Sequence, residues 1–475
     1  MARINLIHKI YIDNLIQQSK QNQLILKELL YSSYPYEEIR TLINNLIYAM
    51  DKLIEQLLLI KENALNENNI NDVDSDIKLY AELLGKVHKL YEFIEVSRVE
   101  NIPQSLVYLI EHLTKNIESE SAFVLVPTYQ NNYLYIELSQ HLHSMFELAI
   151  ENVNDLFPLE DKKFSILMFP FAYKNTFFSY FLLAHEIGHF IENRYDIVAD
   201  LSQNINLDFQ RIDAIARNII LTSFSQFDQP LELFDRNWDS VLARTNSLLR
   251  KIIDNWMKEL VCDLLAINML GPSYIISFVE FILTHANPSI GSTRHPPPLL
   301  RLNLLMSEYE TSGFYKEFEG STLDYIKKFH ECILEIKGEF SEIEINKDSI
   351  GELYYYAYET VEAQLDNIKE KILEITESLN IKCNVKKIVE EIEPLRNSIV
   401  ELVVPCELKL GVPADPVSVL NAAVVVYLVE TENIFSKYQK VLNKSKIEIV
   451  NSLNELSIKG LELCLIQNKV KSIQT

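Results

Sequence analysis

The pattern of apolar and polar positions predicts that the first quarter of the chain is helical. In residues 37–60 apolar side chains recur every seven positions, which is typical of a long helix that packs lengthwise on another helix. These positions are Ile39, Leu46, Leu53 and Ile60 in one register and Ile43, Met50 and Leu57 in the other. The stretch 63–76 (NALNENNINDVDSD) is polar, acidic and rich in asparagine, so we expect a loop there. Helical patterns return at 77–98 and after Pro103, and residues 1–120 are therefore predicted to form a helical bundle.

From residue 121 the pattern indicates short strands followed by many helices. Residues 122–126 and 164–169 are brief apolar runs, closed by Pro127 and Pro170, as expected of strands, and 132–137 is a third candidate. Helical periodicity then dominates at 176–193, 206–224, 231–249, 251–270, 322–380, 417–441 and 444–468. We therefore expect a mostly α fold with a small central β-sheet, of the α+β class.

Composition and charge exclude several classes of function. The chain has 475 residues, enough for two to four structural units. Only 10 residues are glycine, and no G-x-G-x-x-G or G-x-x-x-x-G-K-[ST] loop is present, so Rossmann and P-loop nucleotide sites are excluded. The formal net charge of −23 repels phosphate backbones and anionic lipid surfaces. We therefore predict no nucleic-acid partner.

The cysteines and the apolar runs predict a cytoplasmic protein. The five cysteines are odd in number, widely scattered and never spaced as C-x-x-C, which is typical of free thiols in a reducing compartment. Polar residues are spread through the first 18 positions, where a secretory signal needs an apolar core. The longest apolar runs, near 177–184 and 422–429, fall short of the ~18 residues that span a bilayer. We therefore expect no membrane insertion.

The segment that carries chemistry is TFFSYFLLAHEIGHFIEN at 176–193, which contains a His-Glu-x-x-His motif. Residues four apart share one helix face, so His185 and His189 can present ring nitrogens to a single metal ion. Glu186, rotated by about 100° from His185, can reach a metal-bound water without being a ligand. Gly188 within the helix is expected to allow close approach of a neighbouring backbone or substrate. The alternative, a buried helix with two hydrogen-bonded histidines, is less favoured because the motif follows a predicted strand.

A second apolar helix at 251–271 (KIIDNWMKELVCDLLAINMLG) offers the third protein ligand that a zinc hydrolase needs. Glu259 and Asp263 are four apart on one face of this helix, whose flanks are apolar nearly all round, so both acids require buried partners. We expect Glu259 to be the third ligand and Asp263 to accept a hydrogen bond from a ligand histidine. The alternatives that remain for the third ligand are Asp263, His285, His295 and Cys262.

These two motifs together resemble those of the gluzincin metallopeptidases. The 69 residues between His189 and Glu259 are nearest in length to the HtpX/CAAX prenyl protease family. A further similarity is TRHPP at 293–297, with Arg301 six residues after His295, because in HtpX-type enzymes a Thr/Ser-His-Pro segment followed by an arginine borders the active site. Those relatives are membrane enzymes, whereas no transmembrane helix is predicted here. Prenylated or membrane-embedded substrates are therefore not implied.

The resemblance implies a domain organisation and an activity. We expect the helical bundle at 1–120, a zincin-like metallopeptidase core at 121–310, a charged helical region at 311–400 and a C-terminal helical region at 401–475 that packs on the core. The expected function is that of a soluble zinc-dependent metallopeptidase that hydrolyses peptide bonds of an intracellular protein. The alternative is a catalytically weak or inactive relative that acts as a regulatory binding scaffold, and in either case the helical regions are candidates for binding a regulatory protein.

The expected site contains one Zn²⁺ ion held by His185, His189 and Glu259, with Glu186 as the general base. His295 is the first candidate to stabilise the oxyanion of the transition state. A tyrosine, of which Tyr274 is one option, is the second. The strand at 164–169 is expected to pair with an extended substrate backbone.

Overall fold

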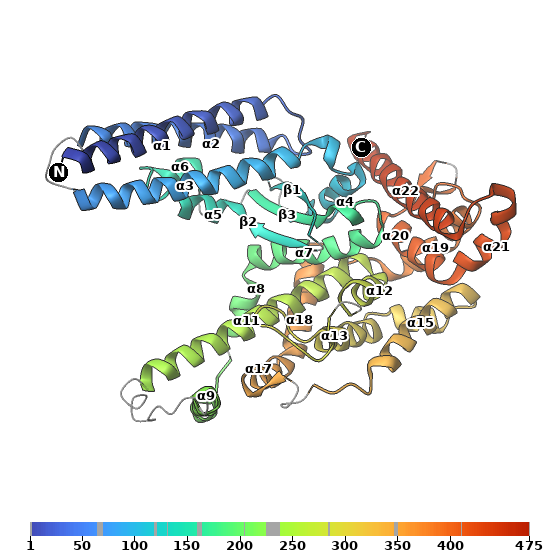
Figure 1. Cartoon of the computed structure of the whole chain (residues 1–475). Coiled ribbons are helices and arrows are strands. Elements are labelled where there is room, and N and C mark those ends of the chain that lie inside the picture. The colour runs from blue at the N-terminus through green and yellow to red at the C-terminus, as the bar shows by residue number, and fades with distance from the viewer. Residues whose placement is uncertain are drawn as a thin grey trace. The chain divides into compact units, whose positions relative to one another are not determined.

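The computed structural model is mostly helical (Figure 1). It describes residues 2–63, 70–117, 121–130, 132–158, 164–203, 205–224, 238–283, 286–345, 350–409 and 411–474. The chain divides into two compact units. The first comprises Met1–Glu111 and Glu118–Asn175, and the second comprises His112–Ile117 and Thr176–Thr475.

Three long helices form much of the first unit: α1 (Ala2–Leu29), α2 (Glu38–Asn63) and α3 (Ile70–Val96). α1 packs against both α2 and α3 (Figure 1). The seven-residue repeat predicted in α2 lies in the core of this bundle. Every position of that repeat from Ile39 to Leu57 is fully buried, whereas Ile60 is partly exposed.

The loop predicted at 63–76 is wrong from Ile70 onward, where α3 begins, and residues 64–69 lie outside the described residues. A second seven-residue repeat explains the difference. Val73, Tyr80, Val87 and Ile94 follow one another at intervals of seven, and all four are buried. The acidic and asparagine residues between these positions have the composition of a loop, whereas the seven-residue spacing of the apolar positions indicates a helix.

A three-stranded mixed sheet completes the first unit, as the sequence predicts. Its strands are β1 (Ala122–Thr128), β2 (Leu134–Glu137) and β3 (Phe164–Pro170). β3 is the middle strand, parallel to β1 on one side and antiparallel to β2 on the other. The runs AFVLV and FSILMF are apolar without alternation because nearly all their side chains are buried, on both faces of the sheet. The remaining helices before Asn175 are α4 (Gln104–Thr114), α5 (Leu138–Phe146) and α6 (Val153–Leu156).

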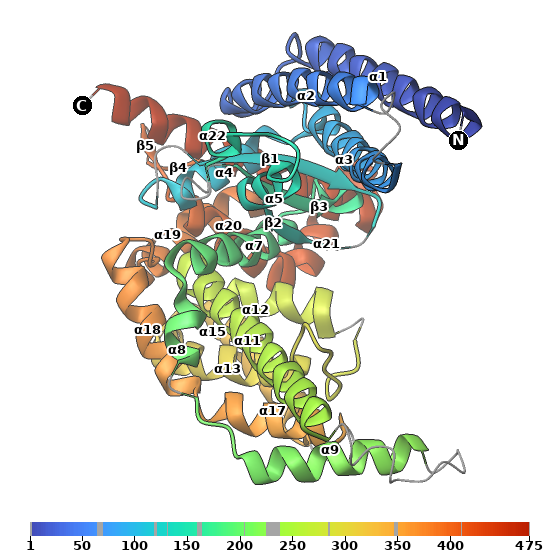
Figure 2. The ribbon, with the colours of Figure 1, turned by 90° about the vertical axis from the view of Figure 1, so that its left-hand side faces the viewer.

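The second unit is built around one long helix, α11 (Trp238–Leu270), whose side chains from Glu259 to Leu270 are all buried. The helices that precede α11 in this unit are α7 (Phe178–Tyr195), α8 (Ile197–Ser202) and α9 (Phe209–Phe224). Those that follow it directly are α12 (Ser273–Phe278), α13 (Pro298–Thr311), α14 (Phe314–Glu319) and α15 (Asp324–Phe340). The later elements are α17 (Glu352–Glu362), α18 (Leu365–Ser378), α19 (Val385–Val400), β4 (Glu407–Lys409), β5 (Val412–Pro413), α20 (Pro416–Val425), α21 (Thr431–Leu442) and α22 (Lys446–Gln474). α11 contacts α7, α8, α9, α12, α13, α17, α18 and α20 (Figure 2).

The observed helix limits and unit limits differ in detail from those expected from the sequence. The separate helices predicted at 231–249 and 251–270 are a single helix from Trp238 onward, and residues 231–237 lie outside the described residues. The limits predicted for a core at 121–310 fall in both units, because the sheet belongs to the first and the His-Glu-x-x-His helix to the second.

Among the residues that the structure describes, one helical stretch, Pro416–Gln439, is long and apolar enough to cross a membrane by length and composition, and its most apolar 18-residue window has a mean hydropathy of 1.3. It runs through α20, a π-helical turn at Val426–Glu430 and most of α21. In this structure 72% of its apolar window is buried by the rest of the chain. That degree of burial is typical of a helix in a protein core.

Candidate metal centre

The His-Glu-x-x-His motif lies in the middle of α7, which is apolar on all sides because the helix is buried along nearly its whole length. The four-residue spacing places the rings of His185 and His189 on one face, with their centroids 4.9 Å apart. His185 is buried, and His189 keeps 21% of its side chain exposed. One side of the pair therefore remains open to solvent.

A glycine allows α11 to approach this face. A Cβ atom at Gly188 would lie 2.8 Å from Cα of Cys262 and 3.1 Å from its carbonyl oxygen, which is closer than real Cβ atoms come to a backbone. Only glycine therefore permits this approach of α7 to α11. A neighbouring backbone, rather than a substrate, accounts for the mid-helix glycine noted in the sequence.

The close approach places Glu259 beside both histidines. Nε2 of His185 lies 3.4 Å from one carboxylate oxygen of Glu259, and Nε2 of His189 lies 3.4 Å from the other. One ligand atom from each of the three residues lies within 4.8 Å of the other two. Tetrahedral ligands held about 2.1 Å from a zinc ion lie about 3.4 Å from one another. The three residues predicted as ligands are thus brought together at a spacing that can hold a metal ion.

Asp263, one turn after Glu259, supports the outer nitrogen of His185. Its Oδ1 lies 3.0 Å from Nδ1 of His185, and the carboxylate is fully buried. Arg301 binds the same carboxylate through two hydrogen bonds of 2.6 and 2.8 Å, and its third guanidinium nitrogen lies 3.2 Å from Glu259. This is the outer hydrogen bond that orients a metal-binding histidine and leaves Nε2 free to face the ion.

Tyr274, the second candidate for an oxyanion donor, belongs to the same support. Its hydroxyl donates a hydrogen bond of 2.6 Å to Asp263 and lies 3.3 Å from Nδ1 of His185. The hydroxyl therefore lies at the outer nitrogen of the ring, whereas Nε2 faces Glu259. Its position favours a role in fixing Asp263 rather than in contacting a substrate.

His189 has a different outer partner, which is a thiol. Sγ of Cys262 lies 3.1 Å from Nδ1 of His189, and the cysteine is fully buried. Burial, with the negative charge of Glu259, raises the pKa of Cys262 well above its usual value, so the group stays a neutral thiol. Cys262, an alternative third ligand by sequence, thus contacts the ring nitrogen that faces away from Glu259.

The charges of the cluster match a divalent cation. Burial opposes ionisation throughout, but hydrogen bonds that His185 donates to Asp263 and Glu259 raise its pKa to about 10. Burial also raises the pKa of both acids, but Arg301 and the neighbouring histidines together outweigh it, so the pKa of Asp263 falls to about 2 and that of Glu259 lies well below its usual range. With Glu186 ionised and His185 neutral, as a metal-binding histidine must be, three buried carboxylates face one guanidinium, an excess of two negative charges. Because buried charges need partners, this donor set fits a doubly charged metal ion.

Glu186 and His295 border the cluster. Glu186 is 6% exposed, its carboxylate makes no hydrogen bond or ion pair with any described residue, and burial raises its pKa. Nε2 of His295 lies 3.8 Å from Glu259, and 59% of the side chain is exposed. The loop that carries His295 is attached to α11, because the Trp256 indole donates a hydrogen bond to the carbonyl of Ser292. His295 therefore lies at the open side of the cluster but is not one of the three grouped ligands.

Two other predictions concern the strand expected to pair with a substrate and His285, an alternative third ligand. The strand predicted to pair with a substrate is β3, but β1 and β2 occupy both of its sides over Ser165–Met168. The prediction that a substrate pairs with this strand is therefore wrong, because an apolar run identifies a strand but not its place in the sheet. His285 lies outside the described residues.

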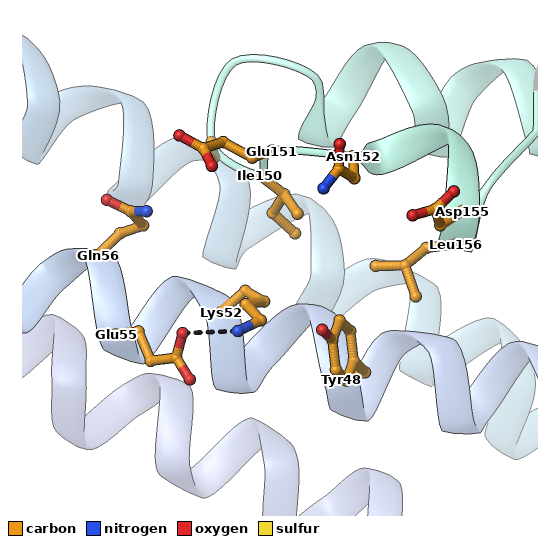
Figure 3. Close-up of a pocket in the computed structure, with 10 residues that line it drawn as sticks. Tyr48, Lys52, Glu55, Gln56, Ile150, Glu151, Asn152, Asp155 and Leu156 are labelled. Atoms are coloured by element: carbon orange, nitrogen blue, oxygen red, sulfur yellow. Dashed lines mark hydrogen bonds and ion pairs between the residues drawn. The ribbon is translucent and has the colours of Figure 1, made fainter.

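No second group of this kind is present among the residues that the structure describes. A pocket of about 400 Å³ in the first unit contains several acids (Figure 3). Glu55 accepts a hydrogen bond of 2.8 Å from Lys52, while Glu151 and Asp155 lie at opposite ends of the pocket. These carboxylates do not converge on one point, so the pocket lacks the arrangement of a metal site.

Comparison of the chain with protein-family models, curated proteins and solved structures finds no match. What the site can do chemically therefore follows from its own residues.

Proposed function

We propose that the chain is a zinc-dependent metallopeptidase of the gluzincin type, acting on a protein or peptide substrate. The observation that carries this proposal is the unpaired, buried carboxylate of Glu186 beside a cluster of three ligands. Structural zinc sites are closed by four protein ligands, whereas catalytic sites use three and leave a position for water or substrate. Two imidazoles and a carboxylate are a ligand set typical of catalytic zinc.

In this mechanism each residue has one task. A zinc ion bound by His185, His189 and Glu259 supplies Lewis acidity, which polarises a carbonyl and lowers the pKa of a water. Glu186 takes a proton from the attacking water and delivers it to the leaving nitrogen, as its raised pKa allows. His295 donates a hydrogen bond to the negative charge that develops on the carbonyl oxygen, as its exposed position allows.

Two substitutions test the proposal. Glu186→Gln should keep stoichiometric zinc and reduce peptide hydrolysis by at least a thousandfold, because the general base is lost while the ligands remain. Glu259→Ala should lose zinc itself, measured by metal analysis after dialysis. Glu331→Gln on the exposed side of α15 is the control and should change neither measurement.

The outcomes separate the proposal from its alternative. Unchanged turnover in Glu186→Gln would contradict the assigned mechanism. Wild-type protein that binds zinc, cleaves no peptide and captures the same proteins as Glu186→Gln would instead favour a regulatory binding scaffold.

A further inference from the structure

A polar pocket of about 640 Å³ lies along α7, α8 and α11 in the second unit. Its lining includes Glu192, which follows His185 and His189 on the same face of α7 at helical spacing, and Asp196, which follows the last residue of that helix. It also includes Asn255, which precedes Glu259 by four residues on the same face of α11. The pocket therefore continues the faces of the two helices that carry the metal ligands.

Two close contacts fix the direction in which the helices run past each other. Gly188 approaches Cys262, and one turn further on Glu192 lies 3.5 Å from Lys258. Along α7 toward α8, the contacting residues of α11 therefore lie progressively nearer to the N-terminus of α11. The pocket occupies the space beyond this ion pair, and its volume is in the range of about 300–1,000 Å³ that is typical of ligand sites.

The charges in the pocket are not evenly distributed. Near the metal centre, Glu192 pairs with Lys258, and Asp254 is flanked by Lys258 and Arg250 one turn away on either side. Asp196, which follows the last residue of α7, also lines the pocket. Beyond Asp254 toward the N-terminus of α11, this helix and α8 contribute no acid to the lining. Its members there are Lys251, Arg250, Ser247, Asn246 and Ala243 of α11, with Val198, Ala199 and Ser202 of α8.

Arg250 and Lys251 form no ion pair or hydrogen bond with any residue in the described part of the chain. In a protein of net charge −23, two adjacent cations at the end of a pocket, with Asp254 as the acidic neighbour of Arg250, are a distinct local feature. A carboxylate that entered the pocket would find charge partners there, and the surrounding amide and hydroxyl groups can bind a peptide backbone.

We propose that this pocket binds the substrate polypeptide on one side of the scissile bond, and that Arg250 and Lys251 recognise an acidic side chain. This inference rests on the proposed peptidase function. The distance along α11 from Glu259 to Lys251 and Arg250 is about 12–14 Å at 1.5 Å per residue. An extended peptide covers about 3.3–3.6 Å per residue, so the acidic residue lies three to four positions from the cleaved bond.

Binding tests the recognition without requiring cleavage. The protein is the full chain with Glu186→Gln, loaded with zinc. The probes are two fluorescent decapeptide libraries, randomised over neutral residues, of which one carries two glutamates at random positions. The acidic library should bind about five- to tenfold more tightly by fluorescence anisotropy, as one or two partly shielded ion pairs allow. Adding Arg250→Glu and Lys251→Glu should abolish the difference, whereas adding Arg244→Glu, on α11 but outside the pocket lining, should preserve it.

Cleavage then tests the position. Wild-type protein incubated with a proteome-derived peptide mixture should yield cleavage sites enriched in aspartate or glutamate three to four residues from the cut, on one side only. The Arg250→Glu, Lys251→Glu double variant should lose that enrichment at unchanged zinc content.

Equal binding of the two libraries would overturn the proposal, and so would a difference that survives the double variant. Cleavage sites without the acidic enrichment would overturn it as well. If wild-type protein cleaves no peptide but the libraries behave as expected, the peptidase function fails while the pocket's recognition of acidic peptides stands.

Discussion

The structure makes its sharpest prediction at Gly188, where a single methyl group should uncouple the two helices of the metal centre. In Gly188→Ala the new Cβ would meet Cα, Cβ and the carbonyl oxygen of Cys262 at 2.8, 3.0 and 3.1 Å. Two of these three atoms are backbone, so no side-chain rotation can relieve the contact. Atoms in ordinary contact lie about 3.5–4 Å apart, and α7 and α11 must therefore separate by roughly 1 Å.

The effect on stability is the smaller part of the result. Overpacking a buried contact costs about 1–3 kcal/mol, but alanine regains about 1 kcal/mol of helix propensity relative to glycine. The free energy of unfolding should therefore fall by only about 0–2 kcal/mol. The metal site is more sensitive, because the shift opens the two 3.4 Å spacings between Glu259 and the histidines. We expect zinc affinity to fall by about 10- to 100-fold, as when the geometry around a zinc ligand is disturbed.

Zinc affinity is measured by competition with a chromophoric chelator, and stability by thermal unfolding of chelated and zinc-loaded protein. Gly85→Ala is the matched control, since Gly85 is exposed within α3 and a Cβ there meets no atom within 4 Å. It should raise stability by about 0.4–1 kcal/mol and leave zinc affinity unchanged. Wild-type zinc affinity in Gly188→Ala would refute the argument that this glycine sets the geometry of the cluster.

Four further predictions concern the protonation of His185 and the residues that support the histidines. Because the pKa of His185 is raised to about 10, zinc binding at pH 7 should release about one proton and strengthen with rising pH, measured by calorimetry in buffers of different ionisation enthalpy. The chelated protein should conversely lose stability as pH rises from 6.5 toward 10, because protonated His185 is stabilised only in the folded state, and a flat profile of Tm over that range would contradict this. Asp263→Asn should weaken zinc binding by about 10- to 100-fold and destabilise the protein by about 3–5 kcal/mol, because Arg301 loses the carboxylate that it binds through two hydrogen bonds and keeps only Glu259 as an ionised buried partner, as denaturant unfolding would reveal. Cys262→Ala should weaken zinc binding by about tenfold while Cys262→Ser restores it, because a hydroxyl can still accept the hydrogen bond from Nδ1 of His189, and equal affinities in the same chelator competition would exclude that role.

Features that depend on local spacing could be predicted from the sequence. The repeat from Ile39 to Leu57 predicts a buried helix face, and the interval between His185 and His189 places two imidazoles on one side of α7. Both follow from the 3.6-residue period of the α-helix, which does not depend on the rest of the fold. The pairing of Glu259 with these histidines required one further step, namely that acids on a buried helix need partners.

Features that depend on which elements meet could not be predicted in the same way. The apolar run at 164–169 predicts the strand β3, but the place of β3 between β1 and β2 depends on contacts across the sheet, so the sequence does not show that no free edge remains for a substrate. The partner of the thiol of Cys262 depends on how α7 and α11 cross, and on their closeness at Gly188. The pocket beyond Lys258 likewise exists only because two helices diverge there, and no pattern within either helix indicates it.

The cluster can keep its charge balanced in two ways, which explains how a buried site of this kind folds and then accepts a metal. At a pH low enough for Glu186 to be protonated as well as His185, two cations, His185 and Arg301, face two ionised carboxylates, Glu259 and Asp263. A divalent ion displaces the proton of His185, and its field also favours the ionised form of Glu186. Three carboxylates then face the ion and Arg301, which is again neutral. Because burial raises the pKa of Glu186, the number of protons released should rise above one as the pH is lowered and Glu186 adds its own, and Glu186→Gln should bring it back to about one. A release of one proton in the wild-type protein at every pH would show that Glu186 is already ionised before the metal binds.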